Sequence, residues 1–453
     1  MNKYRLMKKS KILHHRDKSQ MSSLHRKKVQ VIIIIGVLVA ACIGIWILQS
    51  YILTPRLTEE NNQIPQMMYR MNPQHTGVYT SVSGGISPQG RSAWNFTLPR
   101  LVLMTSPVVL NNTLFFSTGN DDIFALNATT GQEIWHRRIK DQDGGSLAVA
   151  GDTLFTTIYD RTSSDTSKYH SDMFALFTSN GSTKWHITLG SGEASALTVS
   201  NGGVFTTLDN AVYVIDSETG RQIWNVKDDR YLRGEIPTVD NGTIYIAGAD
   251  HVYAYYAENG SRKWTAQPAG SSVGPLVVQN GRVYNEGQFI NQTAILDAVY
   301  ALDTGTGTLL WTFTSWNSSF ESVFTPFVAT NDTLYFGSSS SPFVATNNTI
   351  IGNFTNTMYA LDATTGAVKW TRDFNENVST PSLIGAPSFA DGILYFTCGD
   401  GKLYALDGRS GTVKWTYDIG LPGGEPVIVN GTVYAVGSSR SDQGYTVTLY
   451  AIQ

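Results

Sequence analysis

From about residue 106 to the end of the chain, short apolar runs alternate with turn residues. The first complete unit predicts strands over residues 106–110, 114–117, 123–126 and 133–137, all rich in Val, Ile, Leu, Phe or Thr. Asn-Gly, Asp-Gly or Asn-Asp pairs follow the first strand of most units, and such pairs favour the tight turns that join antiparallel strands. No amphipathic helix is predicted beyond residue 66. The pattern therefore indicates repeated four-stranded antiparallel sheets.

A tryptophan marks the fourth strand of each unit. Seven copies follow an apolar third strand, as in VYALDTGTGTLLW, and successive tryptophans lie 39 to 59 residues apart, a spacing typical of propellers and solenoids. We expect each of them to dock between neighbouring sheets. The eight are Trp94, Trp135, Trp185, Trp224, Trp264, Trp311, Trp370 and Trp415.

The two ends of the repeat region are complementary. Trp94 lies in RSAWNF with no third strand before it, whereas residues 449–452 form a third strand with no tryptophan after it. A single sheet cannot bury both of its faces, so the units must stack, and radial stacking leaves only short edges. We therefore predict an all-β propeller of eight blades, closed by pairing of its N- and C-terminal strands.

The frame Ala-x-Asp-x-x-Thr-Gly-x-x-x-Trp resembles the tryptophan-docking motif of PQQ-type propellers. Other copies are degraded, with Val214, Tyr255 and Phe177 departing from the pattern. The segment 68–77, MYRMNPQHTG, resembles the lead-in of single-domain PQQ-like repeat proteins, so the resemblance covers residues 67–453. The closest matches to the frame are Ala301, Asp303, Gly307 and Trp311; Ala360, Asp362, Thr365, Gly366 and Trp370; and Ala405, Asp407, Gly411 and Trp415.

The resemblance implies two kinds of function. In quinoprotein dehydrogenases the propeller binds PQQ and a calcium ion over the central channel, typically beside a disulfide between adjacent cysteines. This chain has only Cys42 and Cys398, and it has no Cys-x-x-Cys-His haem motif. The other branch is non-catalytic and includes the BamB-type outer-membrane assembly scaffold. By its size and its lack of site chemistry the chain is closer to that branch, although a shared fold does not fix an activity.

An uncharged run of 18 residues, Val31–Leu48, precedes the propeller and is long enough to cross a membrane. The first 28 residues hold ten Lys or Arg and one acid, a bias that places this side in the cytoplasm. We expect a basic tail over 1–28, a membrane anchor over 29–53, a linker over 54–66 and an external propeller over 67–453. The competing interpretation is a cleaved lipoprotein signal, because Val39-Ala40-Ala41-Cys42 fits a lipobox.

Charge and acceptor sites agree with an external propeller. Subtracting the tail from totals of 33 basic and 36 acidic residues leaves 23 against 35, so the rest carries −12. That surface argues against binding to nucleic acid, which requires a basic face. Thirteen Asn-x-Ser/Thr glycosylation acceptors all follow the apolar run, although Asn-Gly-Thr is also common in hairpins. The predicted product is a glycoprotein at the cell surface.

Long insertions fall between the second and third strands of four units, at 160–172, 285–297, 337–357 and 437–445. In a four-stranded meander these loops share one face with the fourth-to-first loops, which makes that face the expected site for a protein or glycan partner. Aromatic and arginine side chains are typical interface anchors. Those on the insertions and adjoining loops are Arg161, Tyr169, His170, Phe289, Phe343, Arg440 and Tyr445, with Arg230, Tyr231, Arg233 and Trp316.

Candidate ligand-binding residues are few. Glu235 and Glu425 each stand just before a first strand, which lines the channel, and there they could hold a cation or polar ligand; capping a turn or facing water is the alternative. His75 is expected to be structural. No Ser-His-Asp, His-Glu-x-x-His or phosphate-loop signature is present. The sequence thus predicts a non-catalytic scaffold that uses no cofactor, with a PQQ-dependent dehydrogenase of atypical site as the alternative.

Overall fold

A computed structural model describes most of the propeller. The described residues are 66–79, 88–99, 105–119, 122–139, 143–163, 165–227, 236–268, 271–290, 295–314, 322–340, 345–346, 349–350, 355–374, 384–441 and 444–453. The predicted tail, apolar run and lipobox lie outside them, as does Glu235. Within the described part, no helix has the length and apolar character needed to span a membrane.

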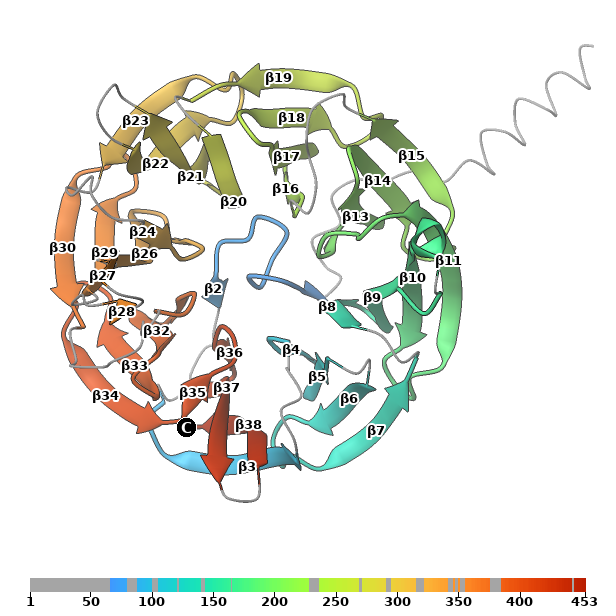
Figure 1. The fold of residues 1–453 in the computed structure, drawn as a ribbon, viewed down its shortest axis with the longest axis horizontal. Coiled ribbons are helices and arrows are strands. Elements are labelled where there is room, and N and C mark those ends of the chain that lie inside the picture. The colour runs from blue at the N-terminus through green and yellow to red at the C-terminus, as the bar shows by residue number, and fades with distance from the viewer. Residues whose placement is uncertain are drawn as a thin grey trace, which may run out of the picture. The chain divides into compact units, whose positions relative to one another are not determined.

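Eight antiparallel sheets form a closed ring, as predicted (Figure 1). Their strands are numbered along the chain. Blades 1 to 4 comprise β4–β7 (Val108–Leu110, Thr113–Ser117, Asp122–Asn127, Glu133–Arg138), β8–β11 (Asp143–Ala150, Thr153–Asp160, His170–Phe177, Thr183–Ser191), β12–β15 (Thr198–Ser200, Gly203–Leu208, Ala211–Asp216, Gln222–Lys227) and β16–β19 (Thr238–Asp240, Thr243–Ala247, Val252–Tyr256, Arg262–Ala266).

The second half of the ring repeats this plan with a split first strand in blades 6 and 8. Blades 5 to 8 comprise β20–β23 (Ser271–Gln279, Arg282–Ile290, Ile295–Asp303, Leu309–Thr314), β24, β25, β26, β29 and β30 (Ser322–Phe324, Val328–Ala329, Thr333–Ser340, Thr355–Asp362, Val368–Asp373), β31–β34 (Ser388–Ala390, Ile393–Cys398, Lys402–Asp407, Val413–Asp418), and β35–β38 (Leu421–Pro422, Val427–Val429, Thr432–Ser441, Gly444–Ile452) with β3 (Ser92–Pro99). Four short elements lie outside the blades: β1 (Gln66–Met67), β2 (Val78–Tyr79), the hairpin β27–β28 (Ala345–Thr346, Thr349–Ile350) and the 3₁₀ helix η1 (Thr166–Lys168).

The ring is closed by its own ends. β3, which carries Trp94, pairs antiparallel with β38 along its length, and Trp94 lies opposite Ala451. β38 is the third strand of blade 8, so β3 supplies the missing fourth strand, as predicted. Closure leaves neither end of the repeat region as an unpaired strand.

Each docking tryptophan ties its blade to the next one. Trp311 of blade 5 donates from Nε1 to the carbonyl of Ala363 in blade 6, at 3.2 Å. Its ring covers Gly366, which has a φ of 74°. Only glycine fits there, because a Cβ atom would lie 2.7 Å from the ring. The same pair of contacts recurs around the ring, ending with Trp415 against Pro88 and Gly90.

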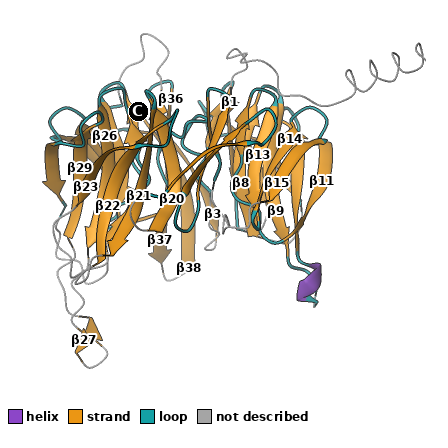
Figure 2. Ribbon diagram, turned by 90° about the horizontal axis from the view of Figure 1, so that it is seen from above, coloured by secondary structure: helices purple, strands orange, loops and turns teal. Residues whose placement is uncertain are grey.

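The insertions lengthen strands on one side of the ring. In blade 4, β17 and β18 have five residues each, whereas β37 and β38 of blade 8 have ten and nine. At about 3.3 Å per residue, four extra residues extend a hairpin by roughly 13 Å. Figure 2 shows η1 of blade 2 and β27 of blade 6 projecting at the same side as the ends of β37 and β38. Blades 2, 5, 6 and 8 thus build what we call the hairpin face.

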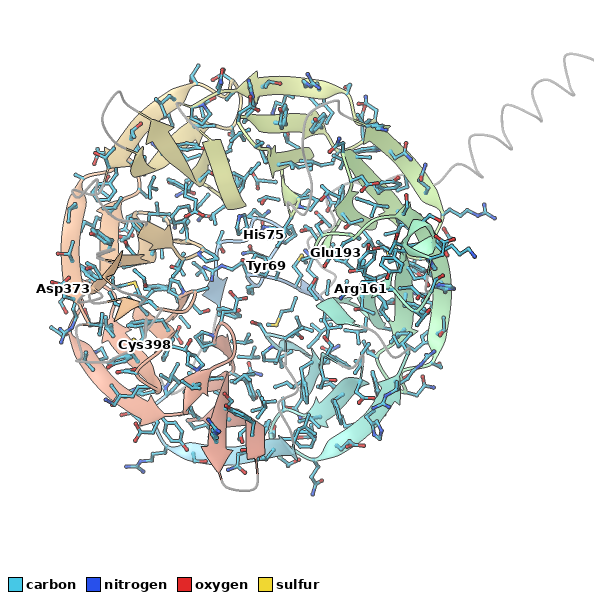
Figure 3. All side chains as sticks on the ribbon, in the orientation of Figure 1. Tyr69, His75, Arg161, Glu193, Asp373 and Cys398 are labelled. Carbon is cyan, nitrogen blue, oxygen red and sulfur yellow. The ribbon has the colours of Figure 1, made fainter. Side chains whose placement is uncertain are left out.

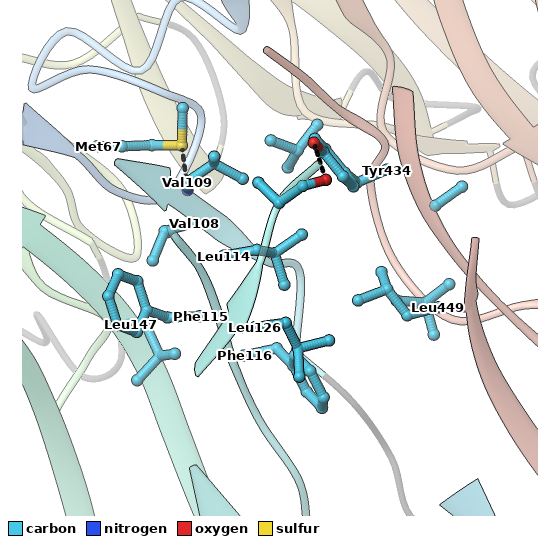
Figure 4. Close-up of a cluster of buried hydrophobic side chains, with 14 of the residues drawn as sticks. Met67, Val108, Val109, Leu114, Phe115, Phe116, Leu126, Leu147, Tyr434 and Leu449 are labelled. Carbon is cyan, nitrogen blue, oxygen red and sulfur yellow. Dashed lines mark hydrogen bonds between the residues drawn. The ribbon is translucent and has the colours of Figure 1, made fainter. Parts of the chain in front are cut away.

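The core is apolar and continuous between neighbouring blades. Leu114, Phe116 and Leu449 pack in one buried cluster that joins blade 1 to blade 8 (Figure 4). Cys398 lies buried at the end of β32, and burial raises the pKa of its thiol to about 12. The thiol therefore stays protonated at neutral pH and behaves as a small apolar side chain.

Candidate functional site

Residues 66–79 lie at the centre of the ring, and we call this segment the plug (Figure 1). It contacts the inner strand of every blade. β1 pairs with β8 of blade 2, and β2 pairs in parallel with β31 of blade 7. The carbonyls of Pro73, Gln74 and Thr76 accept from backbone N–H groups of blades 4, 5 and 6 at 2.8 to 3.0 Å.

Two methionines and an arginine complete the set of plug contacts. The Sδ atom of Met67 lies 2.9 Å from the backbone nitrogen of Val109 in blade 1 (Figure 4). The Sδ atom of Met68 lies 3.2 Å from the backbone nitrogen of Val199 in blade 3. Arg70 reaches blade 8. The inner strands would otherwise expose unpaired backbone donors to the axis, so the plug satisfies groups whose burial without a partner is costly.

Arg70 and Glu425 form a buried ion pair inside the ring. Arg70 Nη1 lies 2.9 Å from Glu425 Oε2 and also donates to the carbonyl of Pro387 at 2.7 Å. Its Nη2 donates to the carbonyl of Phe327. Both side chains are almost fully buried. One guanidinium thus links the plug to blades 6, 7 and 8, and Glu425, a predicted channel residue, faces an internal cation rather than water.

His75 holds the plug against blades 3 and 4. Its Nε2 and Nδ1 each lie 3.0 Å from a threonine hydroxyl, that of Thr198 and that of Thr238. Burial, and then the positive charge of Arg70, lowers the pKa of His75 to about 3, so the ring is neutral at physiological pH. Tyr69 packs edge-on against this ring, and Figure 3 shows the two side chains together at the centre. His75 therefore has a structural environment.

A pocket of about 390 Å³ lies beside the plug and opens between the fourth-to-first connections of blades 7, 8 and 1. Tyr69 and Glu425 provide its polar groups together with two hydroxyls. Burial, reinforced by the negative charge of Glu425, raises the pKa of Tyr69, so its phenol stays protonated. The lining residues are Tyr69, Ser106, Ile384, Gly385, Ala386, Thr397, Pro422, Gly424 and Glu425.

The pocket does not fit the PQQ and calcium ion of the quinoprotein enzymes. Calcium takes six to eight oxygen ligands, usually including several carboxylates. Among the residues that line this pocket, Glu425 supplies the one carboxylate, and Arg70 already neutralises its charge. Among the residues that line this pocket, Tyr69 supplies the one aromatic ring, and that ring packs against His75.

The structure separates the other predicted residues. Arg161 and Tyr169 both approach Tyr159 in blade 2, with the Arg161 guanidinium 5.3 Å from its ring. Arg440 stacks over Tyr445, also at 5.3 Å, at the end of the long hairpin of blade 8. Those outside the described residues are Arg230, Tyr231, Arg233, Glu235, Trp316, Phe343 and the side chain of Phe289.

Sequence reasoning missed the partner of Glu425. Arg70 stands in the lead-in segment, 355 positions away. The available signal was the resemblance of residues 68–77 to the lead-in of related repeat proteins. That resemblance does not indicate that the segment enters the ring.

Comparison with known proteins now assigns the family. The model of the family described as outer membrane protein assembly factor BamB matches residues 81–168, 119–233, 208–349 and 297–442, which together span most of the propeller. The chain belongs to this family. Membership agrees with the predicted resemblance to PQQ-like propellers. The matched residues cover the repeats but neither the plug nor the N-terminal segment.

Solved structures and one characterised relative show how broad this BamB-like fold is. BamB from Moraxella catarrhalis is 16% identical, with a TM-score of 0.53 over 79% of this chain and 96% of that one. Quinohemoprotein alcohol dehydrogenase from Comamonas testosteroni is 12% identical, with a TM-score of 0.61 over 86% and 80%. Both likenesses concern the fold.

A tetrathionate hydrolase from Acidithiobacillus ferrooxidans is 24% identical over 383 residues, 82% of this chain. The chain spans 58% of the length of that relative.

Proposed function

We propose that this BamB-family chain is a non-catalytic scaffold, tethered to the cell membrane through residues 31–48, whose external propeller binds a protein or glycan partner on the hairpin face. The observation that carries the proposal is the plug. The plug fills the centre of the ring (Figure 1), and its Arg70 neutralises Glu425, the one carboxylate among the residues that line the adjoining pocket, which leaves that pocket without a donor set for a metal or quinone. A ring with a filled axis still offers its outer faces for binding.

The hairpin face has the features of a binding surface. Blades 2, 5, 6 and 8 extend it with long strands, and aromatic and arginine side chains lie on the extensions. Tyr445 is 38% exposed although it stacks with Arg440. Such preformed pairs lose little conformational freedom on binding, because two side chains are already ordered. The family description, an assembly factor for outer membrane proteins, also favours a macromolecular partner.

The partner test compares two surfaces of the same chain. The full-length protein, solubilised in detergent, is used to capture binding proteins and glycans from its own cells. We expect the double substitution Arg440→Glu and Tyr445→Ala to weaken capture of a specific partner at least tenfold, because aromatic and arginine anchors contribute about 2 kcal/mol or more each. Quantitative binding of the captured partner measures the effect.

Ile134→Ala is the matched control. Ile134 is 50% exposed on the fourth strand of blade 1, at the outer rim of the ring. Capture that persists in this variant and falls in the hairpin variant supports the assignment. Equal capture by all three proteins contradicts the hairpin face as the binding surface.

The enzyme alternative has its own test. Titration of the purified full-length chain with PQQ and calcium, followed by dye reduction with alcohol or sugar substrates, is expected to give neither saturable binding nor turnover. The physical reason is that one carboxylate already paired with Arg70 cannot supply the oxygen ligands of calcium. Saturable binding with turnover, lost in Glu425→Gln, would replace the scaffold proposal by a dehydrogenase.

A further inference from the structure

Blade 2 carries a cluster of acidic and imidazole groups at its hairpin end. Asp160 ends β9, and His170 and Asp172 begin β10; one ligand atom from each lies within 4.8 Å of the others. The register explains the meeting, because His170 is the cross-strand partner of Asp160 and Asp172 follows on the same face. On the neighbouring strand, His186 Nε2 lies 3.4 Å from Asp172 Oδ1, and His170 Nε2 lies 3.6 Å from the same atom.

The surrounding groups already orient these side chains. His170 Nδ1 lies 2.9 Å from the carbonyl of Lys168, which can only accept, so the ring proton resides on Nδ1 and Nε2 presents its lone pair. The hydroxyl of Thr188 donates to Asp172 Oδ1 at 2.7 Å. A carbonyl behind a histidine and a donor behind a carboxylate are the supports that metal ligands usually have.

Blade 1 contains a matching Asp–His pair on its third and fourth strands but differs at one neighbouring position. Asp122 corresponds to Asp172 and His136 to His186, and both histidines stack on a phenylalanine of the third strand. In blade 1, however, Arg138 holds Asp122 through two hydrogen bonds of 2.9 and 2.7 Å. The position of Arg138 is taken in blade 2 by Thr188, a neutral residue. Blade 2 therefore keeps the carboxylate, and at the position of Arg138 it has a hydroxyl donor to that carboxylate instead of a guanidinium.

We propose that Asp160, His170 and Asp172 bind a zinc ion, with the fourth position filled by His186 or water. Zn²⁺ prefers imidazole nitrogen and carboxylate oxygen at about 2.0–2.1 Å in a tetrahedron, whose edges are then roughly 3.3 Å. The separations of 3.4 and 3.6 Å around Asp172 are close to that edge. Asp172 is buried, whereas both histidines are partly exposed, so an ion can enter from solvent and meet a fixed carboxylate.

The test uses isothermal titration of the chelator-treated full-length chain with zinc sulfate, and the visible absorption of bound Co²⁺ as a second measurement. We expect saturable binding near one ion per chain with a tetrahedral Co²⁺ spectrum. Asp172→Asn and His170→Gln should each weaken binding at least tenfold. Thr188→Arg keeps all the proposed ligands but places an arginine where blade 1 has Arg138. This substitution should weaken zinc binding as much.

His136→Gln is the matched control and should leave zinc binding unchanged. The basic tail holds His14, His15 and His25, which offer a competing site on the same chain. Binding that survives in the Asp172 and Thr188 variants with unchanged affinity, or no saturable binding by the unmodified chain, overturns the proposal. Circular dichroism of each variant separates loss of the site from loss of the fold, and this result is independent of whether a partner binds the hairpin face.

Discussion

Substituting Arg70 by alanine is expected to lower the free energy of unfolding by about 3–5 kcal/mol, because it leaves the Glu425 carboxylate buried without its cation. The carbonyls of Pro387 and Phe327 lose their donor as well. Replacing both charged residues, as in Arg70→Met with Glu425→Leu, removes the uncompensated charge and should recover part of the loss. Urea denaturation followed by tryptophan fluorescence measures each free energy.

The control for the Arg70 and Glu425 substitutions is an ion pair at the surface. Lys168 lies 3.8 Å from Asp165, and both side chains are largely exposed. Exposed pairs contribute about 0–1 kcal/mol, so Lys168→Ala should change stability little. A loss below about 1 kcal/mol in Arg70→Ala would contradict the view that the plug is anchored by its guanidinium.

The second large effect concerns the blade junctions. Trp311→Ala should cost about 3–5 kcal/mol of unfolding free energy, because it opens a cavity between blades 5 and 6 and removes the hydrogen bond to Ala363. Trp311→Phe keeps most of the ring contact with Gly366 and should cost less. Urea denaturation again provides the measurement.

Leu310→Ala serves as the control for Trp311, because the preceding side chain on the same strand is 46% exposed. Its stability should stay within about 0.5 kcal/mol of the parent, as for most surface substitutions. Equal losses in Leu310→Ala and Trp311→Ala would mean that strand propensity, rather than docking between blades, sets the effect.

The fold could be predicted because the same pattern of strands, turns and a docking tryptophan repeats along the chain. Asn241, Asn280 and Asn430 adopt φ of 44° to 51° ahead of a glycine, as the hairpin pairs indicated. Closure followed from an unpaired third strand, the one around Leu449, and an unpaired fourth strand, the one around Trp94. Repetition and complementarity are both visible in a single sequence.

The plug could not be predicted in the same way, because it occurs once. Its contacts are mostly made by backbone carbonyls, such as those of Pro73 and Gln74, which every residue possesses. Arg70, Met71 and His75 adopt positive φ without being glycine, so local propensity argues against the observed path. The zinc candidates were also hidden, since only His170 was singled out and two of its neighbours, Asp160 and His186, lie on the strands that flank β10.

The plug has a mechanical consequence for the membrane tether that we propose. A pull on the chain ahead of Gln66 reaches the plug before it reaches β3, the strand that closes the ring. At the plug the load meets hydrogen bonds and an ion pair that together reach all eight blades. A tether joined directly to β3 would instead unzip that strand from β38 one pair at a time. The plug at the centre of the ring, rather than the closing strand β3, therefore bears the load.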